Sequence, residues 1–138
     1  GMTDVLSKAG RSALMAKVRG YDNATTERRL ATLLRKHGIT GWRRGVLLIG
    51  RPDFVFRSKK VAVFVDGCFW HGCPRHRRVP KSRVAFWTAK LARNEIRDRA
   101  VSRALRSEGW AVLRIWECAL TESRAERTLT RIVRILRG

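Results

Sequence analysis

Residues 63–76, VFVDGCFWHGCPRH, gather side chains that can do chemistry, including two cysteines and two histidines in a chain that has three of each in 138 residues. Thiolate and imidazole groups are the ligands that tetrahedral Zn²⁺ takes in structural sites. Cys68, Cys73 and His76 can supply three of them. Cys118 ends a second apolar run, so it can lie beside Cys68 if the two runs form neighbouring strands. The sequence therefore predicts a structural zinc site, and the alternative is that the cysteines are small buried apolar residues.

Two carboxylates bracket the strands that lead into this segment. Asp53 opens the run PDFVF and Asp66 closes the run VAVFVD, with a turn predicted at residues 58–60. If the two runs form a hairpin, both carboxylates lie at one rim of the sheet. Glu27, on the preceding predicted helix, can supply a third carboxylate. Oxygen ligands of this kind indicate a Mg²⁺ site, whereas the alternative is one Asp in a turn and another that ends a strand.

His71 follows these acids and is left outside the predicted zinc set. Its imidazole changes charge near neutral pH, so it can take a proton from water or pass one on. This makes His71 a candidate catalytic base. The alternative is a supporting or alternate role at the zinc ion.

The elements that must position these side chains follow from the hydrophobic pattern and from capping residues. We expect a basic arm or short helix at residues 7–19, helices at 21–38, 84–107 and 122–137, and strands at 51–57, 61–66 and 110–118, with a weak strand or loop at 41–50. The pattern places Phe86, Leu91, Val101 and Leu105 on the apolar face of the long helix, and Trp42, Trp110 and Trp116 in the core. The predicted fold class is α/β, with a mixed central sheet flanked by helices on both faces. The expected organisation is an arm at residues 1–20 and one domain at 21–138.

The charge of the chain indicates its partner. There are 31 Lys and Arg residues against 11 Asp and Glu, which gives a formal net charge of +20 and an isoelectric point near 11.7. Such a field favours nucleic acid. No apolar run approaches the roughly 18 residues that a membrane span needs, and no signal peptide is recognised. We therefore expect a cytoplasmic protein that acts on nucleic acid and does not bind membranes.

Five segments together resemble the very-short-patch repair (Vsr) endonucleases of the PD-(D/E)XK superfamily: RSALMAKVRGYDNATTERRLATLL, GRPDFVF, VFVDGCFWHGCP, AFWTAKLARNEIRDR and GWAVLRIWECAL. The resemblance runs from about Arg11 to Leu120. It implies a restriction-endonuclease-like fold and Mg²⁺-dependent nicking of one strand of duplex DNA at T·G mismatches left by deamination of 5-methylcytosine. Nicking at an asymmetric mismatch needs no two-fold symmetry, so we expect a monomer. A functional link to a DNA cytosine methyltransferase and to mismatch-repair proteins stays open.

The resemblance assigns roles to particular residues. Asp53 and the main-chain carbonyl of Val65 would hold Mg²⁺, Glu27 would act through water, and His71 would be the catalytic histidine. The zinc ligands would be Cys68, Cys73, His76 and Cys118. Phe69, Trp70 and Trp87 would form an aromatic wedge beside the mismatch, and Met15 would intercalate from the minor groove. Wedges of this kind unstack a mispaired step at the least cost.

The chain departs from the family pattern at several positions. The Lys that the superfamily places two residues after the second acid is Cys68 here. Asp66 and Val65 stand where the best-known form of the family has His and Thr, and the Cys73 and His76 slots exchange Cys and His. Asp66 could add a metal ligand or shift the pH optimum. Two other functions therefore stay open: a site-specific or general nuclease of the same fold, and a non-catalytic zinc-containing DNA-binding protein.

Overall fold

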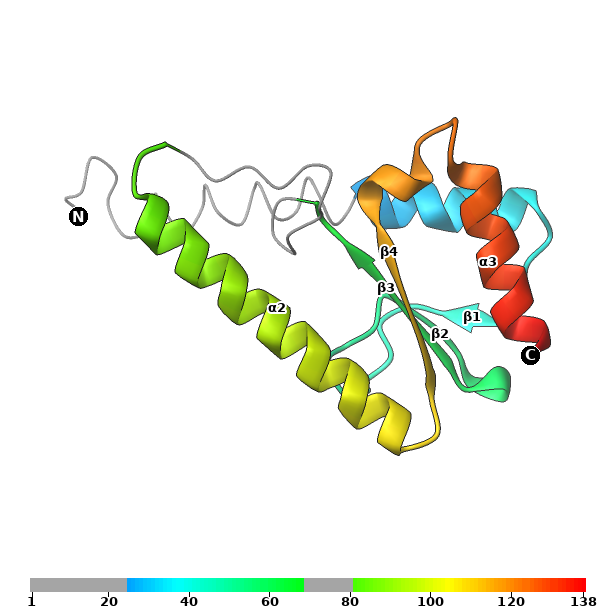
Figure 1. Cartoon of the computed structure of the whole chain (residues 1–138). Coiled ribbons are helices and arrows are strands. Elements are labelled where there is room, and N and C mark those ends of the chain that lie inside the picture. The colour runs from blue at the N-terminus through cyan, green and yellow to red at the C-terminus, as the bar shows by residue number, and fades with distance from the viewer. Residues whose placement is uncertain (1–24, 69–80) are drawn as a thin grey trace.

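The computed structural model describes residues 25–68 and 81–138, which form a four-stranded mixed sheet with three α-helices packed on it (Figure 1). The strands lie in the order β1 (Trp42–Arg43), β2 (Phe54–Phe56), β3 (Val61–Asp66) and β4 (Ala111–Trp116). The pairs β1–β2 and β2–β3 are antiparallel, and β3–β4 is parallel. The sheet is therefore mixed, as the sequence predicted.

Strand β3 is the centre of the sheet, and all six of its residues are buried. Val61, Val63 and Val65 belong to one apolar cluster, whereas Ala62 and Phe64 belong to a second cluster on the opposite face. This alternation follows from the two-residue period of a strand. A run that is apolar at every position has to be covered on both sides.

The helices provide that cover. A helix over residues 25–36 and α3 (Ala125–Arg137) pack on one face of the sheet, and α2 (Val84–Ser107) crosses the other (Figure 1). In α3 the buried residues are Ala125, Thr128, Leu129 and Ile132, a spacing that puts them on one side of a helix. Helix α2 also lies between the parallel strands β3 and β4 in the chain, a connection that such strands require.

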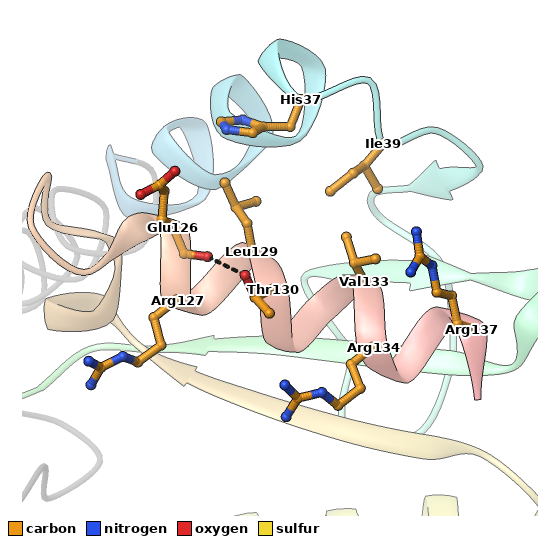
Figure 2. Close-up of a pocket in the computed structure, with 9 residues that line it drawn as sticks. All are labelled: His37, Ile39, Glu126, Arg127, Leu129, Thr130, Val133, Arg134 and Arg137. Carbon is orange, nitrogen blue, oxygen red and sulfur yellow. Dashed lines mark hydrogen bonds between the residues drawn. The ribbon is translucent and has the colours of Figure 1, made fainter.

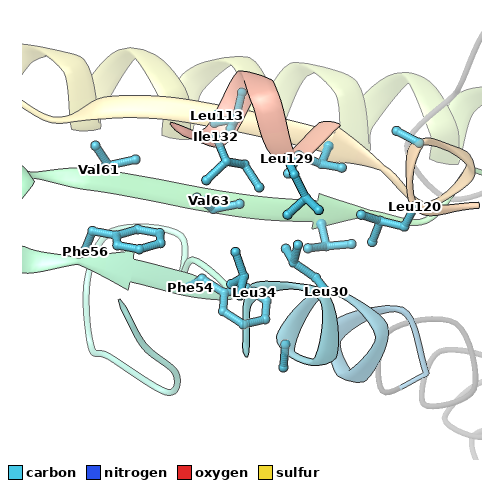
Figure 3. Close-up of a cluster of buried hydrophobic side chains, with 14 residues drawn as sticks. Leu30, Leu34, Phe54, Phe56, Val61, Val63, Leu113, Leu120, Leu129 and Ile132 are labelled. Atoms are coloured by element: carbon cyan, nitrogen blue, oxygen red, sulfur yellow. The ribbon is translucent and has the colours of Figure 1, made fainter. Parts of the chain in front are cut away.

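The main core lies between the sheet, the helix at 25–36 and α3 (Figure 3). It contains fully buried side chains from each of these elements, including Leu30, Leu34, Phe54, Val63 and Ile132. The smaller cluster under α2 is built on Ala62, Phe64 and Leu105. The two cores hold the hairpin β2–β3 from both sides, so the side chains at its rim have a rigid support.

Most of the predicted elements are confirmed in the described part of the chain. The long helix has the predicted bounds of 84–107, and β3 has the predicted bounds of 61–66. The prediction for Phe86 was wrong, because its side chain is 42% exposed while Leu91 and Leu105 are buried. Phe86 lies in the first turn of α2, and this end of the helix extends beyond the sheet (Figure 1). The arm at residues 1–20 lies outside the described residues.

None of the described helices is both long enough and apolar enough to span a membrane.

Candidate active site

The β2–β3 hairpin brings the two predicted carboxylates to one rim of the sheet. Asp53 directly precedes β2, and Asp66 is the last residue of β3, which runs antiparallel to β2. The main-chain N–H of Asp53 donates to the carbonyl of Val63 at 2.9 Å, and the N–H of Val65 donates to Oδ2 of Asp53 at 2.7 Å. The Asp53 carboxyl is therefore held by the main chain of the central strand.

A cavity of about 490 Å³ opens at this rim. It is lined by residues of the hairpin, of the preceding loop, of α2 and of β4: Gly50, Arg51, Asp53, Phe64, Val65, Asp66, Arg97, Asp98, Val101 and Arg114. Acidic side chains and arginines thus share one cavity. Arg51 lies in the left-handed region with φ of 51°, a backbone strain that non-glycine residues adopt mainly where the surroundings enforce it.

The pKa of Asp53 is raised from 3.8 to about 7. Removal of the carboxyl from water is the largest cause, the hydrogen bond from the Val65 N–H opposes it, and the charges of Glu27 and Asp66 add to it. Glu27 and Asp66 are thus close enough to Asp53 for their charges to act on its carboxyl. A cation bound at Asp53 would relieve this unfavourable concentration of negative charge.

Glu27 reaches the rim from the helix at residues 25–36. Its Oε1 accepts a hydrogen bond from Nη2 of Arg44 at 2.6 Å, and its side chain also hydrogen-bonds to Asp53. Thr26, on the same turn, is buried and donates to Oε2 of Glu117 at 3.4 Å. The helix is therefore attached at the rim through polar contacts, in addition to its apolar face.

Asp66 is buried and is paired with Arg114 of β4. Nη1 of Arg114 lies 3.1 Å from Oδ1 and 3.2 Å from Oδ2 of Asp66. The same guanidinium donates to the main-chain carbonyl of Asp98 and to Oγ of Ser102, both on α2, and stacks 4.1 Å from the ring centre of Phe64. Nothing in the sequence pattern singled out Arg114, because the pairing depends on how β4, β3 and α2 meet.

The two described cysteines, Cys68 and Cys118, follow the ends of neighbouring parallel strands. Asp66 pairs with Trp116, so the residues two positions beyond them lie at the same edge of the sheet. The N–H of Cys68 donates to Oε1 of Glu117 at 2.9 Å, which holds the chain after β3 against the end of β4. Glu117 is a second residue that sequence reasoning missed. In the sequence, the one feature that could have pointed to Glu117 is its position between a buried strand and the candidate zinc ligand Cys118.

The remaining predicted ligands and wedge residues lie outside the described residues: Met15, Phe69, Trp70, His71, Cys73 and His76. Within residues 25–68 and 81–138, no group of three or more His, Cys, Asp or Glu side chains is arranged to hold a metal ion. The zinc site and the position of the catalytic histidine therefore remain predictions.

An exposed aromatic group stands at the start of α2. The rings of Phe86 and Trp87 pack edge to face with centres 5.1 Å apart, and the guanidinium of Arg83 lies 4.3 Å from the centre of the Phe86 ring. Trp87 is half-buried and Phe86 is exposed. Cationic and aromatic groups side by side suit contact with nucleic-acid backbone and bases.

A larger cavity, of about 720 Å³, lies between the turn that ends the helix at 25–36 and α3 (Figure 2). His37 and Ile39 line one side, and α3 lines the other with Leu129, Val133 and three arginines. Glu126 is the one carboxylate among its lining residues, and its main-chain carbonyl accepts a hydrogen bond from Thr130 at 3.0 Å. Without converging carboxylates this cavity does not suit phosphodiester chemistry, and the smaller one does.

A mixed sheet that carries acids and arginines at one rim is the kind of site found in proteins that act on phosphodiesters. The comparisons with known proteins agree with this class. Residues 3–77 match the family model described as "DNA mismatch endonuclease Vsr", and the chain belongs to that family.

Several curated proteins are similar to this chain. The type II nicking enzyme V.XorIIP of Xanthomonas oryzae pv. oryzae is 41% identical over 123 residues, which cover 88% of this chain and 89% of that protein. The DNA mismatch endonuclease Vsr of Escherichia coli K12 is 42% identical over 123 residues, or 86% of this chain and 76% of that protein. The type II nicking enzyme V.NaeI of Lentzea aerocolonigenes is 55% identical over 67 residues, but these are 49% of this chain and only 40% of that protein. Family and relatives are consistent with a DNA endonuclease.

Proposed function

We propose that this protein is a Mg²⁺-dependent endonuclease that nicks one strand of duplex DNA at T·G mismatches. The observation that carries the proposal is the half-buried, main-chain-anchored carboxyl of Asp53, whose pKa of about 7 reflects its partial removal from water and the nearby charges of Glu27 and Asp66. The family and the relatives named as nicking enzymes support the reaction class. The net charge of +20 supports a polyanionic substrate.

The donors at the rim fit Mg²⁺. This ion usually binds one or two carboxylates and keeps several waters, rather than occupying a cage of protein ligands. Asp53 offers a carboxylate, and the main chain of Val65 lies beside it. When bound, Mg²⁺ would stabilise negative charge on the attacking and leaving oxygens of the phosphodiester.

The other side chains at the rim would each have a separate role in the reaction. Asp53 would orient the metal ion, and Glu27, which Arg44 holds in place, would position water through a hydrogen bond. Arg51 and Arg97 line the cavity and would bind the phosphate oxygens on either side of the cut. His71 would accept the proton of the attacking water, as the resemblance to the family implies.

We further propose that Zn²⁺ binds Cys68, Cys118, Cys73 and His76. Two of these four residues, Cys68 and Cys118, follow the ends of the neighbouring strands β3 and β4, which supports the proposal. Nη1 of Arg124 lies 3.2 Å from Sγ of Cys118, a contact that suits a thiolate. Zinc would fix the segment that carries His71 to the edge of the sheet, next to the acids.

Recognition of the mismatch would use aromatic and apolar side chains. Phe86 and Trp87 present an exposed aromatic group at the start of α2, and Phe69, Trp70 and Met15 would complete the wedge. Insertion of apolar side chains beside a base step costs a few kcal/mol of unstacking, which is smallest at a mispaired step. The selectivity for T·G would therefore come in part from the weakness of the pair itself.

The test is Mg²⁺-dependent nicking of an end-labelled duplex with one T·G mismatch, beside its matched T·A twin. We expect one nick beside the mismatched T, no nick in the twin, and loss of the product in Asp53→Asn and His71→Ala. Equal cutting of both duplexes would contradict the mismatch specificity and indicate a general or site-specific nuclease. Binding without cutting, across several sequence contexts, would indicate a non-catalytic DNA-binding protein.

A further inference from the structure

Arg114 lies at the point where the rim, the sheet and α2 meet. Its Nη1 contacts both oxygens of Asp66, its Nη2 donates to the carbonyl of Asp98 at 3.2 Å, and its Nε donates to Oγ of Ser102 at 3.0 Å. Oδ1 of Asp98 lies 3.8 Å from Nη1. The guanidinium thus contacts β3 and α2 at once, which fixes its position.

Arg114 forms an ion pair with the carboxylate of Asp66, which would otherwise be available to bind a cation. Asp66 is the last residue of β3, the strand whose Val65 N–H donates to Asp53. The charge of Asp66 contributes to the raised pKa of Asp53. A carboxylate with both oxygens paired to a guanidinium is a poor metal ligand, because the cation competes for the same lone pairs. The burial of Asp66 strengthens the pairing, since water screens it little.

We propose that Arg114 is a positioning residue that holds Asp66 in an ion pair and so keeps its carboxylate out of the metal site at Asp53. This proposal rests on the proposed function, which places a divalent cation there. Arg114 sets the charge and the ligand count of the site: Asp53 is the strand carboxylate that binds the ion, and Asp66 braces β3 against β4 and α2. Asp66, which stands where the best-known form of the family has His, thereby has a charge partner on β4.

The test uses Mn²⁺ alone as the probe, titrated by calorimetry into the full chain without DNA. Neutral variants, Arg114→Met and Arg114→Gln, leave Asp66 uncompensated, and we expect them to bind Mn²⁺ about tenfold more tightly, since one nearby unit charge at an effective dielectric near 20 has an effect of this order. Arg114→Gln keeps hydrogen-bond donors beside Asp66 and serves if Arg114→Met does not fold. Arg131→Met, an exposed change on α3 with the same loss of charge, is the control and should match the wild type.

A double variant tests whether the gain in Mn²⁺ affinity depends on the Asp66 carboxylate. Asp66→Asn combined with Arg114→Met removes both charges, and we expect its Mn²⁺ affinity to return to within about twofold of the wild-type value. Arg114→Lys, which keeps the charge but lacks the planar fork, should also stay near the wild-type affinity. Asp53→Asn should abolish the Mn²⁺ binding in every background, which identifies the site.

The outcomes are distinguishable from a failure of the proposed function. Unchanged Mn²⁺ affinity in both neutral variants, or no return in the double variant, overturns the role of Arg114 even if the protein nicks DNA. The expected Mn²⁺ shifts without any nicking support the role of Arg114 and overturn only the proposed reaction. A wild-type protein that binds no Mn²⁺ overturns both.

Discussion

Replacement of Asp53 by Asn should stabilise the Mg²⁺-free protein relative to the wild type, and this gain should be larger at alkaline pH than at acidic pH. The Asp53 pKa is about 7 in the folded protein against 3.8 for the ordinary carboxyl. Between these two values the folded state binds a proton that the unfolded state has lost, so stability falls as pH rises from about 4 to about 7. Asn keeps an oxygen that can accept from the Val65 N–H but carries no charge, so it avoids this loss.

The magnitude follows from the same values. One pH unit is worth about 1.4 kcal/mol, so the full loss is about 4 kcal/mol, of which about 3 kcal/mol falls between pH 5 and pH 7. The side chain is partly open to solvent, and we halve the figure to about 1.5 kcal/mol for screening. For a chain of this size that corresponds to about 5 °C in Tm. Asp53→Asn should therefore gain about 5 °C on the wild type between pH 5 and pH 8.

The assay is thermal unfolding of both proteins in Mg²⁺-free buffer at pH 5 and pH 8, without a chelator, which would also remove zinc. Glu122→Gln, an exposed carboxylate replaced in the same way, is the control and should show no such gain. Excess Mg²⁺ at pH 8 should raise the Tm of the wild type and not of Asp53→Asn, because only the wild type has the ligand. A Tm difference between Asp53→Asn and wild type that is the same at both pH values would refute the reasoning.

Three further predictions concern the framework around the site. Gly50→Ala should cost about 2 kcal/mol or more of unfolding free energy, measured in urea. The reason is that φ of Gly50 is +72° and the added Cβ would lie 2.3 Å from a methyl of Val101. Gly45→Ala is the control: φ of Gly45 is +70° but the space around it is open, so this change should cost about 1 kcal/mol. Thr128→Val should cost about 1–2 kcal/mol of unfolding free energy, because the buried hydroxyl donates to the carbonyl of Ala119 at 2.6 Å. Thr130→Val, on the exposed side of α3, should cost under about 0.5 kcal/mol. Equal losses of stability in the two variants would contradict this reasoning. Cys118→Ser should lower the zinc content measured by atomic emission from about one ion per chain and lower the Tm, and an unchanged zinc content would remove Cys118 from the site.

The sequence could predict the elements whose signal is local. The apolar run at residues 61–66 predicted the strand that became β3, and the hydrophobic pattern of residues 122–137 predicted a helix, which the structure has as α3. The hairpin followed from two strands with a short turn, and with it the placement of Asp53 and Asp66 at one rim. Each of these inferences needs only the period of the pattern and the reach of a few residues.

The sequence alone determined the class of fold, the polyanionic partner, the pair of strand carboxylates and the family to which the chain belongs. Only the tertiary structure decided that Arg114 pairs with Asp66, that Glu117 holds the main chain of Cys68, and that Phe86 is exposed rather than buried. The partners in the two contacts are 48 and 49 residues apart in the chain. Periodicity fixes which side of an element a residue occupies, but it carries no information on which distant side chain lies opposite, and that is settled by the packing of whole elements against each other.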